Sequence, residues 1–151
     1  MRREAAAAAV LAVMLPLYAE RISAGTREKV EAIGKAHGVP VSVVRAMISE
    51  ESGGDCLAVG PVVDGYSAKG LFQIYTKPSN LDYLMWKYWK KDRKFDIFCP
   101  EDNAEVALHY LSDLHKAYRT WYRALLFYNC GRIEGAPAVS EGYATRIISA
   151  R

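Results

Sequence analysis

The chain has 151 residues, 51% of them hydrophobic and 25% charged, which are the values of one ordinary globular domain. Lys and Arg number 20 against 17 Asp and Glu, so the net charge is only +3 and does not call for nucleic acid as a partner. The contents of Gly (11) and Pro (6) argue against a disordered, collagen-like or low-complexity chain. Any function must therefore come from a local site.

The N-terminal segment differs from the rest of the chain. Residues 5–19 carry no charge and follow a short head with two arginines, the pattern of an export signal. As a helix this run would span about 22 Å, less than the roughly 30 Å of a bilayer core, and Pro16 interrupts it. We expect residues 1–25 to be a signal peptide or an N-terminal membrane anchor, and residues 26–151 to form the domain. A buried first helix is the alternative.

An exported protein would be periplasmic or associated with the cell wall. An oxidising compartment would allow one disulfide among Cys56, Cys99 and Cys130, and the sequence leaves the pair open. The separations of the cysteines exclude a CxxC redox or zinc motif, and the histidines do not share a metal-ligand spacing with them. We therefore predict no metal, and we expect His109 and His115 at the surface.

The remaining sequence predicts a mainly α fold, because strict period-two alternation is almost absent. A glycine-containing loop at residues 56–74, long for a small domain, could hold a short β-hairpin. Six helices are expected, at residues 27–37, 42–52 with Ser42 as the N-cap, 80–89, 102–119, 121–128 and 140–150.

One carboxylate lies on an apolar helix face. Glu51 comes seven residues after Val44 and four after Met47, which is the spacing of one side of an α-helix. A glutamate directed at a core is rare unless it is paired or functional. Burial and a place in the last helical turn both raise the pKa of a carboxyl, which suits it to act as a proton donor. The alternative is a boundary glutamate that reaches water or pairs with Arg45 or a lysine.

Five short segments, taken in order, resemble the lytic transglycosylase family, whose SLT domain has a goose-type-lysozyme-like fold. Each segment alone is a weak signal, and their common order makes the resemblance specific. The segments are AMISEESGG at 46–54, AV at 58–59, GLFQI at 70–74, FYNCG at 127–131 and GYA at 142–144. The resemblance implies a single lysozyme-like domain with a long active-site loop.

The resemblance also implies an enzyme that cuts the β-1,4 bond between N-acetylmuramic acid and N-acetylglucosamine in peptidoglycan. The single catalytic acid of the family falls on Glu51, which would protonate the glycosidic oxygen and then accept the proton of the muramoyl O6. That chemistry leaves a 1,6-anhydro end. The substrate's N-acetyl group can assist, so neither a second carboxylate nor a cofactor is required. The expected partner is the glycan strand, and the expected state is a monomer.

Two segments supply the substrate contacts that the resemblance implies. Gly70, Phe72 and Gln73 match the Gly-Leu-Met-Gln segment of the family, with Phe in place of Met. The glycine lets the backbone approach a sugar, and the amide of Gln73 can donate and accept hydrogen bonds. A turn residue with an exposed amide is the alternative for Gln73.

Further contacts are implied near the C-terminus. The resemblance places Tyr128 near Glu51, whereas Asn129 either orients that network or ends its helix. Tyr143 is expected in the core with a contact to substrate, and Glu141 as an ordinary acid of a first helical turn.

The chain departs from the family pattern in the loop. A serine is common nine residues after the acid, but this position is Gly60, and Ser67 is the candidate replacement. Asp64 stands where goose-type lysozymes carry an acid. If its carboxylate lay roughly 6.5–9.5 Å from Glu51, it could activate water in an inverting hydrolase. A catalytically silent module for wall binding or secretion-system assembly is the other alternative.

A basic run extends from Lys87 to Lys94 beside Trp86 and Trp89. A solvated helix face is the plain interpretation. The alternative is a surface that grips an anionic polymer by charge and stacking.

Overall fold

The computed structural model describes residues 21–150, so most of the expected leader lies outside the described residues. This part of the chain folds into six helices and one two-stranded antiparallel sheet, which confirms the mainly α fold class. The elements are α1 (Ala24–Ala36), α2 (Val41–Ser52), β1 (Ala68–Lys69), β2 (Ile74–Tyr75), α3 (Pro78–Tyr88), α4 (Pro100–Tyr118), α5 (Trp121–Cys130) and α6 (Ala138–Ser149).

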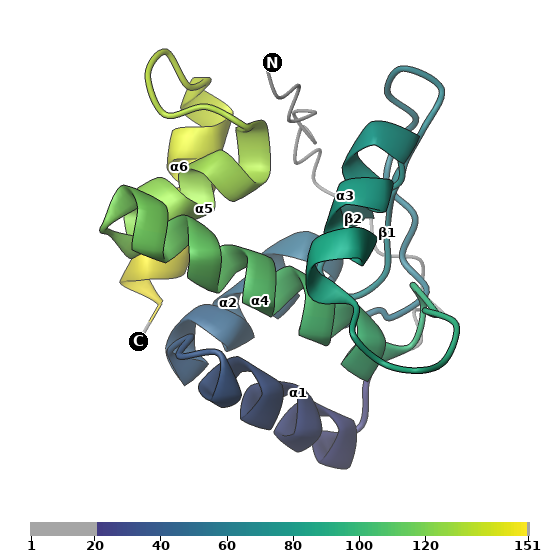
Figure 1. Cartoon of the computed structure of the whole chain (residues 1–151). Coiled ribbons are helices and arrows are strands. Elements are labelled where there is room, and N and C mark those ends of the chain that lie inside the picture. The colour runs from purple at the N-terminus through teal and green to yellow at the C-terminus, as the bar shows by residue number, and fades with distance from the viewer. Residues whose placement is uncertain (1–20, 151) are drawn as a thin grey trace.

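The helix α4 is the axis of the fold, as Figure 1 shows. Helices α1, α3 and α5 all pack against it, α6 packs against α5, and α2 packs against both α1 and α6. The helix α4 therefore contributes fully buried side chains such as Leu108 and Leu111, which share one core with Met47 of α2 and Leu125 of α5. This packing places the C-terminal end of α2 in contact with α6 and holds it inside the molecule.

The helix boundaries follow from local capping. Ser23 caps α1 by accepting a hydrogen bond from the Thr26 amide (3.1 Å). Our assignment of Ser42 as the N-cap of α2 is wrong, because the helix already begins at Val41 and the carbonyl of Pro40 accepts its first hydrogen bond, from the Val44 amide (3.1 Å).

The long loop contains the short hairpin that we expected. Strands β1 and β2 pair antiparallel, with Ala68 opposite Tyr75, and an isolated bridge from Val59 to Lys69 adds a third stretch of backbone. Strand β2 lies next to the helix α3 that follows it.

Two expectations about side chains are revised. No disulfide joins any two of Cys56, Cys99 and Cys130 in the described structure. Both His109 and His115 are half-buried instead of lying freely at the surface, and the ring of His115 stacks on Trp121.

Residues Arg21–Ser23 are bound to the domain. The Ile22 amide donates to the Gly54 carbonyl (2.9 Å), and Arg21 forms an isolated bridge with Asp55. None of the helices in residues 21–150 is long and apolar enough to cross a membrane.

We expect a chain that begins at Glu20 to be more stable than one that begins at Gly25. The shorter chain loses the Ser23 cap and the Ile22 hydrogen bond, a loss of about 1–2 kcal/mol in the free energy of unfolding. Urea unfolding of the two chains measures the difference. Equal midpoints and slopes would show that Arg21–Ser23 contribute nothing to the fold.

Candidate active site

Glu51 lies in the last turn of α2 and is only 7% exposed. Burial is the main cause that raises the pKa of Glu51 to about 8, a hydrogen bond from Tyr143 acts in the opposite direction, and the charge of Glu50 adds to the rise. Arg45 pairs with Glu31 (2.6 Å), and no Lys or Arg of the described residues forms an ion pair with Glu51. Glu51 is therefore a protonated carboxylic acid at neutral pH.

Two tyrosines border this acid. The hydroxyl of Tyr143 in α6 donates to Oε1 of Glu51. The hydroxyl of Tyr128 in α5 donates to the carbonyl of Phe72 (2.7 Å), and burial together with the nearby charge of Glu51 raises the pKa of Tyr128 well above its ordinary value. Both phenols therefore keep their protons. Because Tyr143 has no exposed surface, we assign it to the acid and not to the substrate contact that we expected.

The serine that follows the acid fixes the end of α2. Ser52 is buried, and its hydroxyl donates to the carbonyl of Leu71 (2.8 Å) in the segment between β1 and β2. The amide of Gly54 in turn donates to the Ser52 oxygen (3.3 Å). The two consecutive residues thus have different roles: Glu51 is the buried acid, and Ser52 holds the segment between β1 and β2 through its hydrogen bond to Leu71.

Asn103, which no sequence motif singled out, holds the segment between β1 and β2 in place. This fully buried side chain of α4 accepts a hydrogen bond from the Phe72 amide (2.8 Å) and donates to the carbonyls of Ile97 (2.9 Å) and Lys69 (3.2 Å). Gly70 has φ +81° and lies directly against Asn103. One amide therefore satisfies three backbone groups, one in β1, one in the segment that follows it and one in the loop before α4.

Gln73 is held in a strained conformation. Its backbone has φ +50°, and its side-chain nitrogen donates to the carbonyls of Gly70 (3.0 Å) and Ala58 (3.2 Å). Since both amide hydrogens are engaged, the oxygen is the atom left to contact a ligand. A Cβ added at Gly60 would lie 2.8 Å from that oxygen. A serine at position 60 would therefore require the Gln73 side chain to move.

Three further expected site residues are buried. Phe72 has no exposed side-chain surface, so it is a core residue and cannot make the substrate contact that we expected from it. Ser67 is 8% exposed and lies in the hairpin, where its carbonyl accepts from Thr76. Asn129 is 3% exposed. Gly131, and not Asn129, ends α5.

Asp64 lies on the exposed tip of a turn. Val63 and Tyr66 pair across it, and Asp64 and Gly65 have φ +52° and +80°, the conformation of an Asp-Gly hairpin turn. The charge of Glu50 contributes to the raised pKa of Glu51, whereas Asp64 is not among the groups that shift it. The turn alone explains an aspartate at this position.

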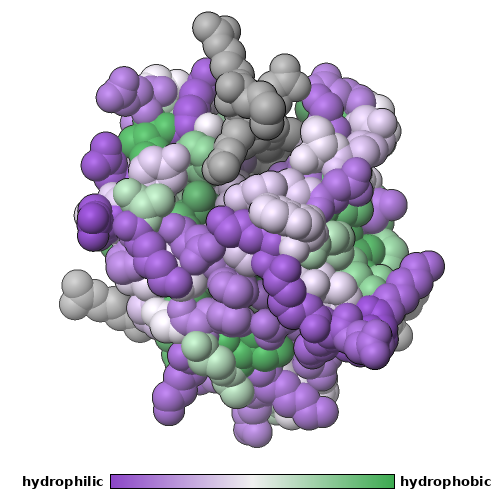
Figure 2. Space-filling model, viewed as in Figure 1, coloured by the Kyte–Doolittle hydropathy of each residue, from purple (hydrophilic) through white to green (hydrophobic). Residues whose placement is uncertain are grey.

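The basic run from Lys87 to Lys94 makes specific contacts with the rest of the protein and is not merely a solvated helix face. Arg93 binds the buried carboxylate of Asp102 through two nitrogens, one of them at 2.7 Å, and Lys90 donates to the carbonyl of Trp86. Figure 2 shows hydrophilic side chains gathered over the loop that follows α3. The run therefore anchors this loop to the first turn of α4 through Arg93.

Replacing Tyr143 with Phe is expected to raise the pKa of Glu51 further, because the lost hydrogen bond is the contact that lowers it. The proton of Glu51 would then be released at higher pH. A carboxyl titration followed by isotope-edited NMR measures this shift. A fall in the pKa of Glu51 in the variant would contradict the assignment of Tyr143 as donor.

The fold and the site together define a lysozyme-like domain with the buried acid Glu51 at the end of α2. In a comparison with protein families, the model described as the Transglycosylase SLT domain matches residues 28–148. The chain belongs to this family, which acts on peptidoglycan, and the resemblance seen in the sequence is confirmed. A comparison with individual curated proteins gave no match.

Proposed function

We propose that this protein is a lytic transglycosylase that cleaves the β-1,4 bond between N-acetylmuramic acid and N-acetylglucosamine with Glu51 as its single catalytic acid. The observation that carries the proposal is the raised pKa of Glu51, about 8, in a buried setting with a tyrosine as its hydrogen-bond partner. An acid that keeps its proton at neutral pH can transfer it to a glycosidic oxygen.

The reaction needs no water. Glu51 gives its proton to the glycosidic oxygen as the bond to C1 of the muramic acid breaks, and the N-acetylglucosamine leaves as an alcohol. The electron-deficient C1 is stabilised by the substrate's own N-acetyl group. The Glu51 carboxylate then takes the proton of the O6 hydroxyl as O6 bonds to C1. The product is a 1,6-anhydro end, and Glu51 regains its proton.

The neighbouring residues support the two states of Glu51. Tyr143 donates a hydrogen bond that stabilises the carboxylate formed after the first step. In this proposal the oxygen of Gln73 accepts a hydrogen bond from an acetamido or hydroxyl group of the glycan. Gly70, expected at the sugar, instead makes room for Asn103 and the Ile97 carbonyl and so holds the loop that carries Gln73. We propose Tyr128, Asn129 and Ser67 as further candidate contacts to the glycan.

The competing functions give different products. A muramidase that used Asp64 as a base would add water and leave reducing ends, and a silent wall-binding module would release nothing. Digestion of purified peptidoglycan followed by mass spectrometry separates these outcomes, because anhydro ends are lighter by one water than reducing ends. We expect anhydro muropeptides from the wild type and from Asp64→Asn, which keeps a residue suited to the turn. Reducing ends that disappear in Asp64→Asn would instead establish the hydrolase.

The proposed substrate also sets the proposed location. Peptidoglycan lies outside the cytoplasmic membrane, so we propose export by the N-terminal segment to the periplasm or the cell wall, with that segment as the source of any membrane association. We propose that the protein acts as a monomer. Fractionation of cells that express the full chain, compared with a chain lacking residues 1–20, tests the export.

A further inference from the structure

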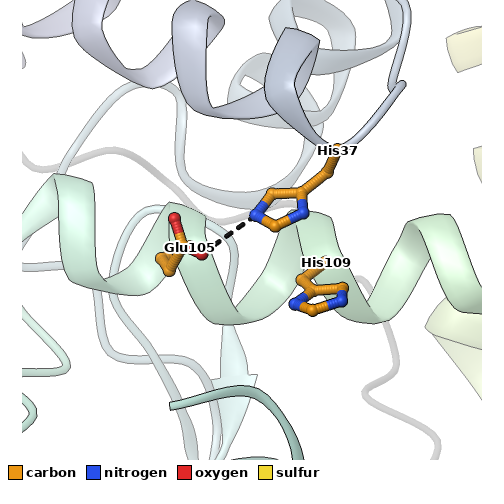
Figure 3. Close-up of side chains that lie close together, drawn as sticks. All are labelled: His37, Glu105 and His109. Atoms are coloured by element: carbon orange, nitrogen blue, oxygen red, sulfur yellow. Dashed lines mark hydrogen bonds and ion pairs between the residues drawn. The ribbon is translucent and has the colours of Figure 1, made fainter. Parts of the chain in front are cut away.

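We propose that His37, Glu105 and His109 form a binding site for a divalent transition-metal ion, of which Zn²⁺ fits best. Figure 3 shows the three side chains, His37 from the end of α1 and the other two from α4. One ligand atom from each residue lies within 4.8 Å of the others. This site is independent of Glu51 and of the proposed glycan cleavage.

The geometry is close to that of a metal site. Glu105 and His109 are one helical turn apart on α4, so they lie on the same side of the helix. His37 Nε2 and Glu105 Oε1 are 2.9 Å apart, which is near the separation of two atoms that share a tetrahedral ion with bonds of about 2.0–2.1 Å. Ligand atoms around such an ion are about 3.3 Å apart, so the His109 nitrogen must approach by up to about 1.5 Å to complete a three-ligand set.

The rings must rotate to bind one ion. His37 and His109 stack with their centroids 4.4 Å apart and their planes 18° apart, so their nitrogen lone pairs lie in nearly parallel planes. Lone pairs that bind one ion must converge. Rotation of the His109 ring about its second side-chain torsion, which has broad minima, achieves this and shifts the ring relative to His37 and to Tyr88, whose ring centroid is 4.9 Å away.

The surroundings favour a cation of this class. Within residues 21–150, Glu105 forms an ion pair with His37 and with no Lys or Arg, so no permanent positive charge neutralises its carboxylate. Two imidazoles and one carboxylate are the ligand types that Zn²⁺ prefers. The side chains of His37 and Glu105 are 18% and 27% exposed, which leaves room for water as a fourth ligand.

The backbone already holds the ligands in place. His37 caps α1, and its amide donates to carbonyls of the last helical turn. The helix α1 packs along α4, so the two elements that carry the ligands form one rigid unit. A bound ion would therefore act as a clip between the end of α1 and the middle of α4. Our expectation of no metal rested on the separations of the cysteines and on histidines that share no metal-ligand spacing with them, and it did not consider Glu105.

The test is zinc binding by the full-length chain at pH 7.5. We expect the wild type to bind one equivalent in equilibrium dialysis and to melt at a higher temperature with excess Zn²⁺ than with a chelator. In His109→Gln the affinity should fall at least about tenfold, since even changes around a ligand cost about that much. His115→Gln is the matched control, because His115 lies on the same helix, also stacks on an aromatic ring and is outside the cluster.

Thiols could also bind zinc, so a second metal and a second variant identify the ligands. Co²⁺ in a site of two nitrogens and one oxygen gives visible absorption without the near-ultraviolet band of thiolate ligation. Glu105→Gln keeps a hydrogen-bond partner for His37 and removes the negative charge, so it preserves the fold if His109→Gln does not. Three results would each overturn the proposal. They are absence of zinc binding by the wild type, binding by both cluster variants with the affinity of the wild type, and a thiolate band in the Co²⁺ spectrum.

Discussion

Replacing Glu51 with Gln is expected to lower the rate of peptidoglycan cleavage by about 10²–10⁴-fold. Glutamine has nearly the same shape and can still contact the Tyr143 hydroxyl, but it has no proton to give to the glycosidic oxygen. Release of soluble muropeptides from purified peptidoglycan measures the rate. Cleavage at the wild-type rate would exclude Glu51 as the acid and with it the proposed mechanism.

Glu50→Gln is the matched control for this experiment. Glu50 is the preceding residue in the same helix, is partly exposed and forms a two-point ion pair with Arg146 (2.9 and 3.0 Å). Its charge raises the pKa of Glu51, so the control should lower that pKa and leave cleavage in place at pH 6–7.

The Glu51→Gln substitution should also change how stability depends on pH. The pKa of Glu51 is about 8 in the folded protein against an ordinary value of 4.5, so between these values the folded state binds a proton that the unfolded state has lost. Wild-type stability therefore falls as pH rises through this interval, by up to about 1.4 kcal/mol per pH unit. Glu51→Gln removes this contribution. Urea unfolding between pH 5 and pH 8 should show a shallower decline for the variant.

Among Gly→Ala substitutions in the loop at residues 56–74, we expect Gly70→Ala to destabilise the fold most. A Cβ at this position would overlap the carbonyl oxygen of Ile97 and the amide nitrogen of Asn103, and the backbone has φ +81°. The overlap cannot be relieved without breaking the hydrogen bonds of Asn103. We expect a loss on the order of 4 kcal/mol in the free energy of unfolding.

Gly65→Ala separates the two causes of that loss. Gly65 has φ +80°, nearly the same as Gly70, but no atom lies within 4 Å of its added Cβ. The loss in the free energy of unfolding of Gly65→Ala therefore reflects the backbone strain alone, about 1–2 kcal/mol. Thermal or urea unfolding of both variants gives the comparison. Equal losses would mean that the contact with Asn103 has no energetic weight.

The helices and the acid could be predicted because each depends on local spacing. The apolar face of α2 identifies Glu51 as a buried carboxyl from the sequence alone, and Gly53 and Gly131 end their helices in the left-handed conformation that is common for glycines at helix C-termini. The N-cap of α2 was misplaced by two residues, at Ser42 instead of Pro40, because a serine shortly after a proline resembles a cap, although the proline carbonyl already accepts the first hydrogen bond of the helix.

The residues that hold the site together were harder to find. Asn103 lies four residues before Ala107 on the buried side of α4, so its burial could have been inferred, but its three partners come from segments outside that helix. The buried carboxylate of Asp102 is likewise paired with a residue outside its helix, Arg93, which belongs to the basic run that we interpreted as a solvated face. Such contacts arise from packing between elements, and no spacing within one element predicts them.

The hydrogen bonds of Asn103 also set the dynamics of the site. Because one buried side chain joins the loop at Lys69 and Phe72 to the first turn of α4, these segments must open together or not at all. The Phe72 amide should consequently exchange its hydrogen with solvent only as slowly as the core of α4 unfolds. The segment between β1 and β2 is therefore held in one position relative to α4.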